Sequence, residues 1–305
     1  MVEGGRIVSL LPAATEIVAA LGAMHRLVGV THACDFPEGA RTLPRVTSSA
    51  VGADSSALDI DTAVRTAVSE GQTLFALDAA RIRALAPDVI ITQALCDVCA
   101  VSETDVRAVA ASLTPSPRII SLGACTLDDV MQSIGTVGHA IGAQNEAAEV
   151  NDALRLRLHA VHLTLKSVRA PRYRVAVVEW TDPLYVAGHW VPDMVRRAGG
   201  IDAVATPGEH SRSRTVRDLQ DAGPEILIFA PCGFDMARST AEARCTLQRP
   251  EWEWARHLPC FAIDGNAFTS RPGPRLVDGV EIFARIFNPR LFSPLGPDRA
   301  QRVQT

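Results

Sequence analysis

Residues 145–167 form the stretch that most restricts what this chain can fold into. The stretch contains neither Gly nor Pro. Its apolar side chains recur at helical spacing, at Val150, Leu154, Leu158, Val161 and Leu165. Leu156 and Leu163 mark a second apolar face. The sequence therefore predicts one uninterrupted helix about 34 Å long, which is long enough to brace two lobes.

On both sides of this helix, short β-rich runs alternate with helical patterns. We predict strands at residues 6–10, 27–30, 88–92, 118–122, 174–180, 225–230 and 260–264. The helices predicted between and after them cover residues 12–21, 58–68, 79–85, 127–141, 191–200, 236–247 and 274–287. Ser102 is placed to cap a further helix, with Asp105 three residues later in its first turn. Strand–helix alternation of this kind indicates mostly parallel sheets covered by helices.

The predicted fold class is therefore α/β, with two α/β lobes joined by one long backbone helix. The length of 305 residues exceeds what one compact core usually holds, which agrees with two lobes. The domains predicted along the chain are an N-terminal lobe (1–144), the backbone helix (145–167), a C-terminal lobe (168–290) and a tail (291–305).

Charge and hydropathy exclude some classes of function. The net charge of −4 comes without a basic stripe, so we expect no nucleic-acid partner. The Arg-rich stretch at 210–217 is short and interrupted, which favours a solvated loop. No apolar run reaches the roughly 18 residues of a membrane span. Pro12 and Glu16 interrupt the first apolar run, unlike an export signal, so we expect a cytoplasmic protein. We also expect a monomer.

The seven cysteines leave three interpretations open. Their odd number argues against a disulfide framework. Cys96 and Cys99 stand in LCDVCAVSETD, directly after a predicted strand. They line a turn beside a ligand, or bind zinc or an iron–sulfur cluster together with Cys34 and Cys232, or perform thiol redox chemistry. The other three are interpreted as packing residues: Cys125, Cys245 and Cys260.

Unusual side chains concentrate where the predicted strands end. Ligands of open α/β sheets bind outside the carboxyl ends of the strands. Those ends are followed by HACDFP (32–37) and residues 93–101 in the first lobe, and by WTDPLYVAGHW (180–190), PCGFD (231–235) and GNAFTSRPGP (265–274) in the second. The aromatic rings in WTDPLYVAGHW are large enough to cover a flat ligand. The hydrolase, P-loop and dinucleotide motifs GxSxG, HExxH, GxxxxGK[ST] and GxGxxG are absent, so we expect binding without catalysis.

Four blocks of sequence resemble a known family. They are RIVSLLPAATEIVAALGAMHRLVGVTHACDFP, IRALAPDVIIT, VAGHWVPDMVRRAGGIDAV and DGNAFTSRPGPRLVDGVEIF. Over residues 6–287 the chain resembles the helical-backbone (class III) substrate-binding proteins of ABC importers, in particular their cobalamin-binding members. The resemblance implies a periplasmic-binding-protein-like fold, with a ligand held between two lobes that a rigid helix joins. Without an export signal, the chain looks like a cytoplasmic branch of that family.

The resemblance also implies a ligand, namely cobalamin or a related corrinoid or metal chelate. The site residues predicted for it are Asp35, Gln93, Trp180, Asp182, Tyr185, His189, Trp190, Phe234, Asn266, Phe268 and Arg271. The aromatic residues would form walls, the Asp, Asn and Arg side chains would bind amides or a phosphate, and His189 would approach the metal. The alternative hypothesis is a cytoplasmic metalloprotein whose cysteine-bound zinc or iron–sulfur cluster acts on or senses a small molecule.

An ABC permease is the partner that the family implies. Its cobalamin binder presents one glutamate per lobe to arginines of the permease, and the matching positions here are Ala80 and Arg217. Asp78 and Asp218 lie close by in the sequence. Arginine opposite an arginine socket is repulsive, so we expect conventional docking to be weakened.

Overall fold

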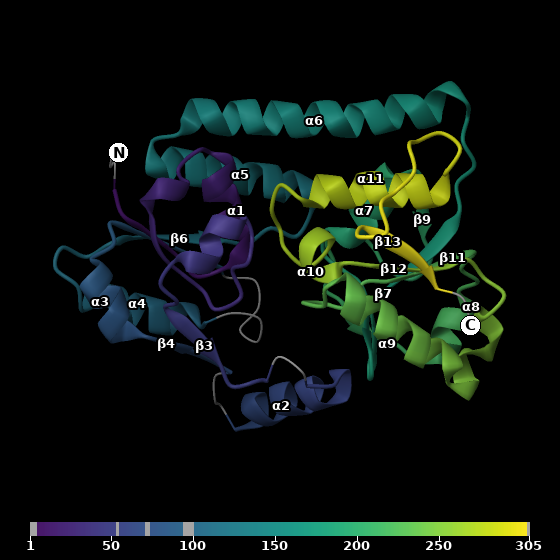
Figure 1. Cartoon of the computed structure of the whole chain (residues 1–305), viewed down its shortest axis with the longest axis horizontal. Coiled ribbons are helices and arrows are strands. Elements are labelled where there is room, and N and C mark those ends of the chain that lie inside the picture. Colours follow the sequence, from purple (N-terminus) through teal and green to yellow (C-terminus); the bar gives the residue numbers. More distant parts are fainter. Residues whose placement is uncertain (1–4, 53–54, 71–73, 94–100, 304–305) are drawn as a thin grey trace. The chain divides into compact units, whose positions relative to one another are not determined.

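The chain divides into two compact units. The computed structural model describes residues 5–52, 55–70, 74–93 and 101–303. Residues 1–124 with 128–152 make the first unit, and residues 125–127 with 153–305 make the second. Each unit has its own sheet with covering helices (Figure 1). The predicted fold class, two α/β lobes with mostly parallel sheets, is confirmed.

Helix α6 (Gln144–Ser167) carries the chain from the first unit to the second without a break. Its 24 residues span about 36 Å at 1.5 Å per residue, as predicted. In the second unit it buries Leu154, Leu158, Val161 and Leu165. The second apolar face is not buried, since Leu156 is 69% exposed and Leu163 is 50% exposed.

The sheet of the first unit is entirely parallel. Its strands are β1 (Ile7–Ser9), β2 (Leu27–Val30), β5 (Val89–Gln93) and β6 (Arg118–Leu122), in the order β2-β1-β5-β6. The helices of this unit are α1 (Pro12–Ala20), α2 (Ala57–Ser69), α3 (Ala79–Leu85), α4 (Glu103–Ala111) and α5 (Leu127–Ile141), with 3₁₀ turns η1 (Met24–Arg26) and η2 (Glu38–Thr42). A small antiparallel pair, β3 (Thr47–Ser49) and β4 (Phe75–Leu77), was not predicted.

Local sequence explains where the helices of the first unit begin and end. Pro12 opens α1 directly after β1, because its fixed φ suits the first helical position. Gly22 follows α1 at a φ of +72°, a conformation that favours glycine. The Ser102 hydroxyl oxygen accepts a hydrogen bond from the Asp105 amide at 3.1 Å, which confirms the predicted cap of α4.

The sheet of the second unit is mixed. Its central strands β7 (Arg174–Thr181), β11 (Ile226–Phe229) and β12 (Cys260–Ile263) are parallel. The short strands around them are β8 (Leu184–Val186), β9 (Ile201–Asp202), β10 (Arg212–Ser213) and β13 (Ala300–Val303). The strand order is β10-β8-β7-β11-β12-β13, with β9 pairing β7. Antiparallel strands therefore close both ends of a parallel centre.

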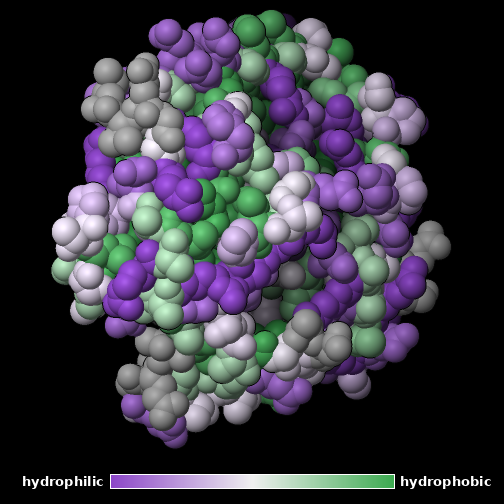
Figure 2. Space-filling view, turned by 60° about the vertical axis from the view of Figure 1, so that its left-hand side comes forward, coloured by the Kyte–Doolittle hydropathy of each residue, from purple (hydrophilic) through white to green (hydrophobic). Residues whose placement is uncertain are grey.

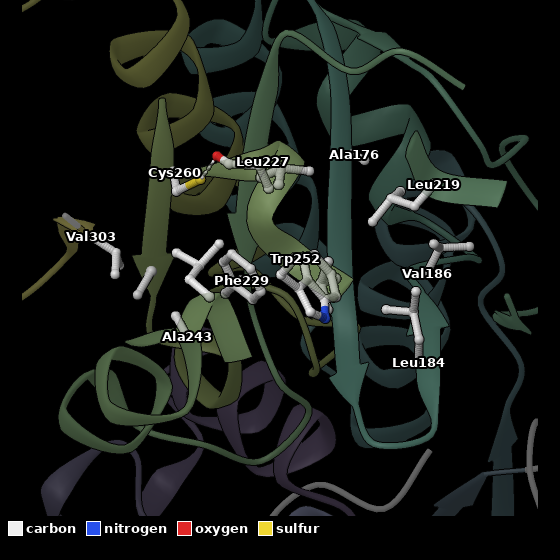
Figure 3. Close-up of a cluster of buried hydrophobic side chains, with 14 residues drawn as sticks. Ala176, Leu184, Val186, Leu219, Leu227, Phe229, Ala243, Trp252, Cys260 and Val303 are labelled. Atoms are coloured by element: carbon white, nitrogen blue, oxygen red, sulfur yellow. Dashed lines mark hydrogen bonds between the residues drawn. The ribbon is translucent and has the colours of Figure 1, made fainter. Parts of the chain in front are cut away.

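Helices cover both faces of this second sheet (Figure 1). They are α7 (Val191–Arg197), α8 (Val216–Asp221), α9 (Met236–Gln248), α10 (Gly265–Phe268) and α11 (Leu276–Phe287), with the 3₁₀ turn η3 (Pro250–Ala255). The fully buried Trp252 of η3 packs beside Phe229 of the central strand, at 5.7 Å between ring centres. Figure 3 shows these rings among the aliphatic side chains of the cluster. The aromatic pair therefore anchors η3 to one face of the sheet.

Three details of the second unit differ from the sequence-based expectations. The predicted tail contains β13, whose Val303 pairs with Cys260 of β12 and is 4% exposed. The predicted solvated loop at 210–217 includes β10 and the start of α8. Cys245 is exposed on α9 rather than packed. These strands have two to four residues, too few for a periodicity to show, and they form only because distant partners supply their hydrogen bonds.

The surface is of mixed polarity. Figure 2 shows hydrophilic and hydrophobic residues interspersed over the visible face. Within the part of the chain that the structure describes, no helix combines the length and hydropathy that crossing a bilayer requires.

Candidate functional site

The predicted residues of the first unit lie at the carboxyl edge of its sheet. Strands β1, β2 and β5 are parallel, so their carboxyl ends share one edge. Asp35 follows β2, and Gln93 is the last residue of β5. Both are half-buried. This edge can offer a carboxylate and an amide to a ligand.

A buried hydrogen-bond network fixes the loop that carries Asp35. Cys34 is 1% exposed, and its Sγ lies 3.1 Å from the Thr15 hydroxyl oxygen. The Thr15 hydroxyl also donates to Ser9 Oγ at 2.8 Å, and Arg45 Nη1 donates to the Cys34 carbonyl at 2.8 Å. Cys34 is thus part of the packing between this loop and α1.

His32 stands in the same loop, although it was not among the predicted site residues. Its Nδ1 lies 2.8 Å from the Thr47 hydroxyl oxygen, and its ring stacks on Phe75 at 5.4 Å between centres. Burial, and secondarily the charge of Arg45, lowers the pKa of His32. The imidazole is therefore neutral at pH 7. Its place directly after a strand was the sequence signal for it.

In the second unit, Trp180 and Tyr185 face each other across a hairpin. Trp180 belongs to β7, and Tyr185 is its partner on β8. Trp180 meets Phe234 edge to face, with 5.4 Å between ring centres. Phe234 is only 2% exposed, and the Arg238 guanidinium lies 3.6 Å from its ring centre. Phe234 therefore supports Trp180 from the protein side, while Trp180 and Tyr185 keep partial exposure.

The loops after β11 and β12 are joined to each other. The Asn266 amide donates to the Phe234 carbonyl at 3.0 Å, and the Gly233 amide donates to Ser270 Oγ at 3.3 Å. Gly265 has no room for a side chain, because a Cβ there would lie 2.3 Å from the Pro231 carbonyl oxygen. These contacts hold the two loops as one rigid surface.

Two further predicted polar residues meet on that surface. Arg271 Nη2 donates to Asn266 Oδ1 at 2.7 Å, and Arg271 is 6% exposed. Phe268, the last residue of α10, has the Arg299 guanidinium 5.9 Å from its ring centre. The guanidinium of Arg271 is therefore held in a defined orientation beside a partly exposed amide.

A pair of imidazoles lies at the start of α7. His189 Nε2 and His210 Nδ1 are 3.0 Å apart, and the rings are nearly perpendicular. His189 also lies beside Trp190, at 5.5 Å between ring centres. Trp190 is 7% exposed and donates from Nε1 to the Thr269 carbonyl at 2.6 Å. His210 was not predicted as a site residue, because the pairing across 21 positions leaves no local pattern.

The backbone of this segment is held in place as well. His189 adopts a φ of +53°, and its amide donates to the Glu209 carbonyl. Ser211 Oγ donates to Glu179 at 2.9 Å, which ties the His210 segment to β7. Burial, followed by the neighbouring His210, lowers the pKa of His189. At pH 7 the His189 ring is neutral, the form that binds metals.

Other predicted residues lie elsewhere or outside the description. Asp182 forms an ion pair with Arg249 at 3.5 Å. Cys232 is exposed. Cys96 and Cys99 fall outside the described residues, so the four-cysteine metal site stays a prediction. Within the described ranges, no group of three or more His, Cys, Asp or Glu side chains is placed to hold a metal ion.

Near Ala80 and Arg217, the two positions singled out by the resemblance, acidic side chains serve as helix caps. Asp78 accepts from the Arg81 amide at 2.8 Å at the start of α3. Asp218 forms a capping box with Thr215 at the start of α8. Arg217 is exposed and pairs with Asp221 at 3.0 Å. The exposed charge at position 217 is therefore basic, with an acid beside it.

Two α/β lobes joined by one helix, with polar and aromatic loops at the strand ends, define a two-lobed solute-binding protein. A family model described as periplasmic binding protein matches residues 7–253. The chain belongs to this family. Membership of a family of binding proteins is consistent with the binding role expected from the sequence.

Solved structures confirm the fold. A periplasmic heme-binding protein from Pseudomonas aeruginosa is 21% identical, with 99% of this chain and 98% of that chain covered and a TM-score of 0.73. The periplasmic vitamin B12-binding protein of Vibrio cholerae is 19% identical, with coverages of 93% and 96% and a TM-score of 0.65.

A protein described as an ABC-type Fe³⁺-hydroxamate transport system, from Saccharomonospora viridis, is also similar. It is 20% identical, with 94% of each chain covered and a TM-score of 0.63. Among proteins with curated descriptions, none matches this chain.

Proposed function

We propose that this chain is a non-catalytic binder of a metal chelate, namely cobalamin or a related corrinoid. The observation that carries the proposal is the His189–His210 pair, whose ring nitrogens are 3.0 Å apart beside Trp190. The residues that would make the ligand surface of the second unit are Trp180, Tyr185, Asn266, Phe268 and Arg271.

The imidazole pair favours a ligand that contains a transition metal. Neutral imidazole binds cobalt and iron well, and the lowered pKa of His189 keeps its ring neutral at pH 7. The hydrogen bond between the rings occupies one nitrogen of each. Because one neutral ring donates and the other accepts in this bond, only one outer nitrogen, either Nδ1 of His189 or Nε2 of His210, keeps the lone pair that would bind a metal. A hydrogen bond of this kind orients a metal-binding histidine.

The remaining side chains suit a large ligand with polar substituents. Trp180 and Tyr185, adjacent on the β7–β8 hairpin, present partly exposed aromatic rings that a flat apolar ligand can cover. Arg271, oriented by Asn266, suits a phosphate because its guanidinium forms paired hydrogen bonds. A corrinoid presents a flat ring, amides and a phosphate, and so uses all three features.

The comparisons support a metal chelate as the class of ligand, and they do not decide which chelate it is. The similar structures are described as binding heme or vitamin B12, or as belonging to Fe³⁺-hydroxamate transport. An ABC permease is the partner we propose for the loaded protein. We expect its affinity to be reduced by the exposed Arg217.

Titration of the purified protein with separate chelates tests the proposal. The ligands are cyanocobalamin, hemin and a ferric hydroxamate, measured by calorimetry and visible absorption. We expect saturable 1:1 binding of cyanocobalamin, quenching of tryptophan fluorescence, and a 10–100-fold weaker complex for His189→Gln and for His210→Gln. His257→Gln, at an exposed histidine of the same unit, is the matched control and should bind normally.

The possible outcomes test separately whether the ligand is a metal chelate and whether that chelate is a corrinoid. Tight binding of hemin without cyanocobalamin would replace the corrinoid and keep the chelate. Binding of metal-free protoporphyrin as tightly as hemin would remove the role of the imidazoles. No saturable binding of any chelate would overturn the proposal.

A further inference from the structure

A basic pocket lies between helices α6 and α7 of the second unit. Its volume is about 430 Å³. The side chains that line it are Arg155, Leu158, His159, His162, Arg196 and Arg197. Among the described residues, this lining brings three guanidinium groups and two imidazoles together without an acidic side chain. The three guanidinium groups, two of which share the single carboxylate of Asp193, leave a net positive charge around a concave surface that suits an anion.

Helix α6 supplies one wall of this basic pocket. Arg155, His159 and His162 are spaced by four and three residues, so they share one face of the helix. The two imidazole rings stack, with 6.3 Å between their centres. Leu158 is 9% exposed and gives the pocket an apolar base. These residues lie in the middle of a 24-residue helix, where the helix dipole gives no reason for positive charge.

Helix α7 supplies the other wall, and a buried carboxylate fixes it. The Asp193 side chain is 4% exposed and accepts from both arginines. Arg196 Nε donates to Asp193 Oδ1 at 3.1 Å, and Arg197 Nε donates to Asp193 Oδ2 at 3.1 Å. A guanidinium held in place in this way loses less conformational entropy when it binds a ligand. The pocket is thus organised before any ligand arrives.

The basic pocket is separate from the proposed chelate surface. Trp190 is the residue that precedes α7, whereas Arg196 and Arg197 form its last turn. Seven helical residues separate the two ends by about 10 Å. One short helix therefore carries an aromatic and imidazole surface at its start and a cationic pocket at its end.

We propose that this basic pocket binds a small phosphate monoester. Guanidinium groups match the geometry of phosphate oxygens through paired hydrogen bonds. The volume lies within the range of about 300–1,000 Å³ that is usual for small-molecule sites. Because the pocket is larger than one phosphate ion, it has room for an organic group over Leu158 and the stacked imidazoles. The inference is independent of the chelate that the protein binds.

Calorimetry on the full chain tests this proposal, with inorganic phosphate and glycerol 3-phosphate as probes. We expect saturable binding that tightens from phosphate to the ester. Arg155→Gln and Arg196→Gln should each weaken it about tenfold, the loss of one charge-assisted contact. Lys166→Gln removes an exposed charge from the same helix, outside the pocket, and should leave the affinity unchanged.

Three results would overturn the proposal. The first is no saturable binding of either probe to the unaltered chain. The second is equal weakening in Lys166→Gln, which would show general charge screening. The third is succinate binding at least as tightly as glycerol 3-phosphate, which would make the pocket a carboxylate site. Arg155 is exposed, so its variant should melt at the same temperature as the unaltered chain.

Discussion

The sheets of the two units are built differently, and the difference decides how each holds its predicted site residues. In the first unit the four strands of the main sheet, β2, β1, β5 and β6, are all parallel. Asp35 therefore stands in a connecting loop and Gln93 at a strand end. In the second unit β7 extends past its parallel pairing with β11 and turns back through β8. Trp180 and Tyr185 are consequently strand residues, held by cross-strand pairing.

This comparison indicates that the second unit holds its predicted site residues more rigidly than the first unit does. Strand and helix positions hold a side chain more tightly than loop positions do. Trp190 is fixed by a hydrogen bond to Thr269, and the two following loops are bonded to each other. The rings of the second unit are therefore preorganised, which reduces the entropy lost on binding.

The largest expected effect comes from the core beneath the second sheet. Trp252 is 1% exposed and packs on Phe229 and Trp254. Trp252→Ala should lower the free energy of unfolding of the second unit by about 3–5 kcal/mol. Urea unfolding with hydrogen exchange would measure this, and the fast-exchanging amides should be those of β7, β11 and β12.

The matched variant for the first unit is Ile90→Ala. Ile90 is 1% exposed in the core between the parallel sheet and helices α3 and α4. Ile90→Ala should lower the free energy of unfolding of the first unit by about 2–5 kcal/mol. The amides that exchange faster should be those of β1 and β5. If either variant accelerates hydrogen exchange equally in the amides of both sheets, the two units unfold together. That result would contradict the separate stability of the two units.

Those parts of the fold that depend on local pattern could be predicted. The run DVIIT became β5, and the uninterrupted segment 145–167 became α6. Four of the five side chains predicted for its apolar face are buried, and Val150 is half-buried. Strands β8 and β13 could not be predicted, because three or four residues show no periodicity and their partners are set by tertiary pairing. Local propensity is a weak guide for segments of this kind.

The same distinction holds for the candidate site. Trp180, Tyr185 and His189 were predictable as unusual residues at a strand end. The partner of His189 was not, since His210 meets it only through the pairing of β8 with β10. The basic pocket was equally hidden, because Arg155 and Arg196 come from different helices. Contacts between distant segments are the information that a single sequence lacks.

The second prediction concerns pH and the edge strand β9. The pKa of Asp202 is raised from 3.8 to about 6 by burial, against two backbone hydrogen bonds from Val204 and Ala205. A raised pKa in the folded state means that the contribution of Asp202 to stability is greatest below pH 4 and falls as pH rises from about 4 to 6. The loss from this group is at most about 3 kcal/mol.

Asp202→Asn keeps an acceptor for those two amides and removes the charge. We expect Asp202→Asn to raise the free energy of unfolding by about 1–3 kcal/mol at pH 7.5. Between pH 4 and 6, the free energy of unfolding of the variant should fall much less than that of the unaltered chain. Thermal unfolding across that range measures both. An unchanged slope would show that Asp202 is not the group responsible. Asp221→Asn, at an exposed carboxylate, is the control.

A smaller effect tests the rigidity attributed to the second unit. Trp190→Phe removes the hydrogen bond from Nε1 and leaves the Thr269 carbonyl without that donor. The cost should be about 1–3 kcal/mol, because the group is buried. Tyr185→Phe, at a half-buried ring of the neighbouring strand, should cost less than about 0.5 kcal/mol. If Trp190→Phe and Tyr185→Phe lower the free energy of unfolding equally in urea, the hydrogen bond of Trp190 does not hold its ring in place.

The smallest expected effect concerns the helix that the two units share. Leu156 is 69% exposed on α6, whereas Leu154, two residues earlier, is 5% exposed. Leu156→Gln should change the free energy of unfolding by less than about 0.5 kcal/mol, while Leu154→Ala should cost about 2–5 kcal/mol. Urea unfolding and size-exclusion chromatography measure the pair. A loss above about 1 kcal/mol for Leu156→Gln, or a change in its elution, would mean that a partner covers this face of α6 in solution.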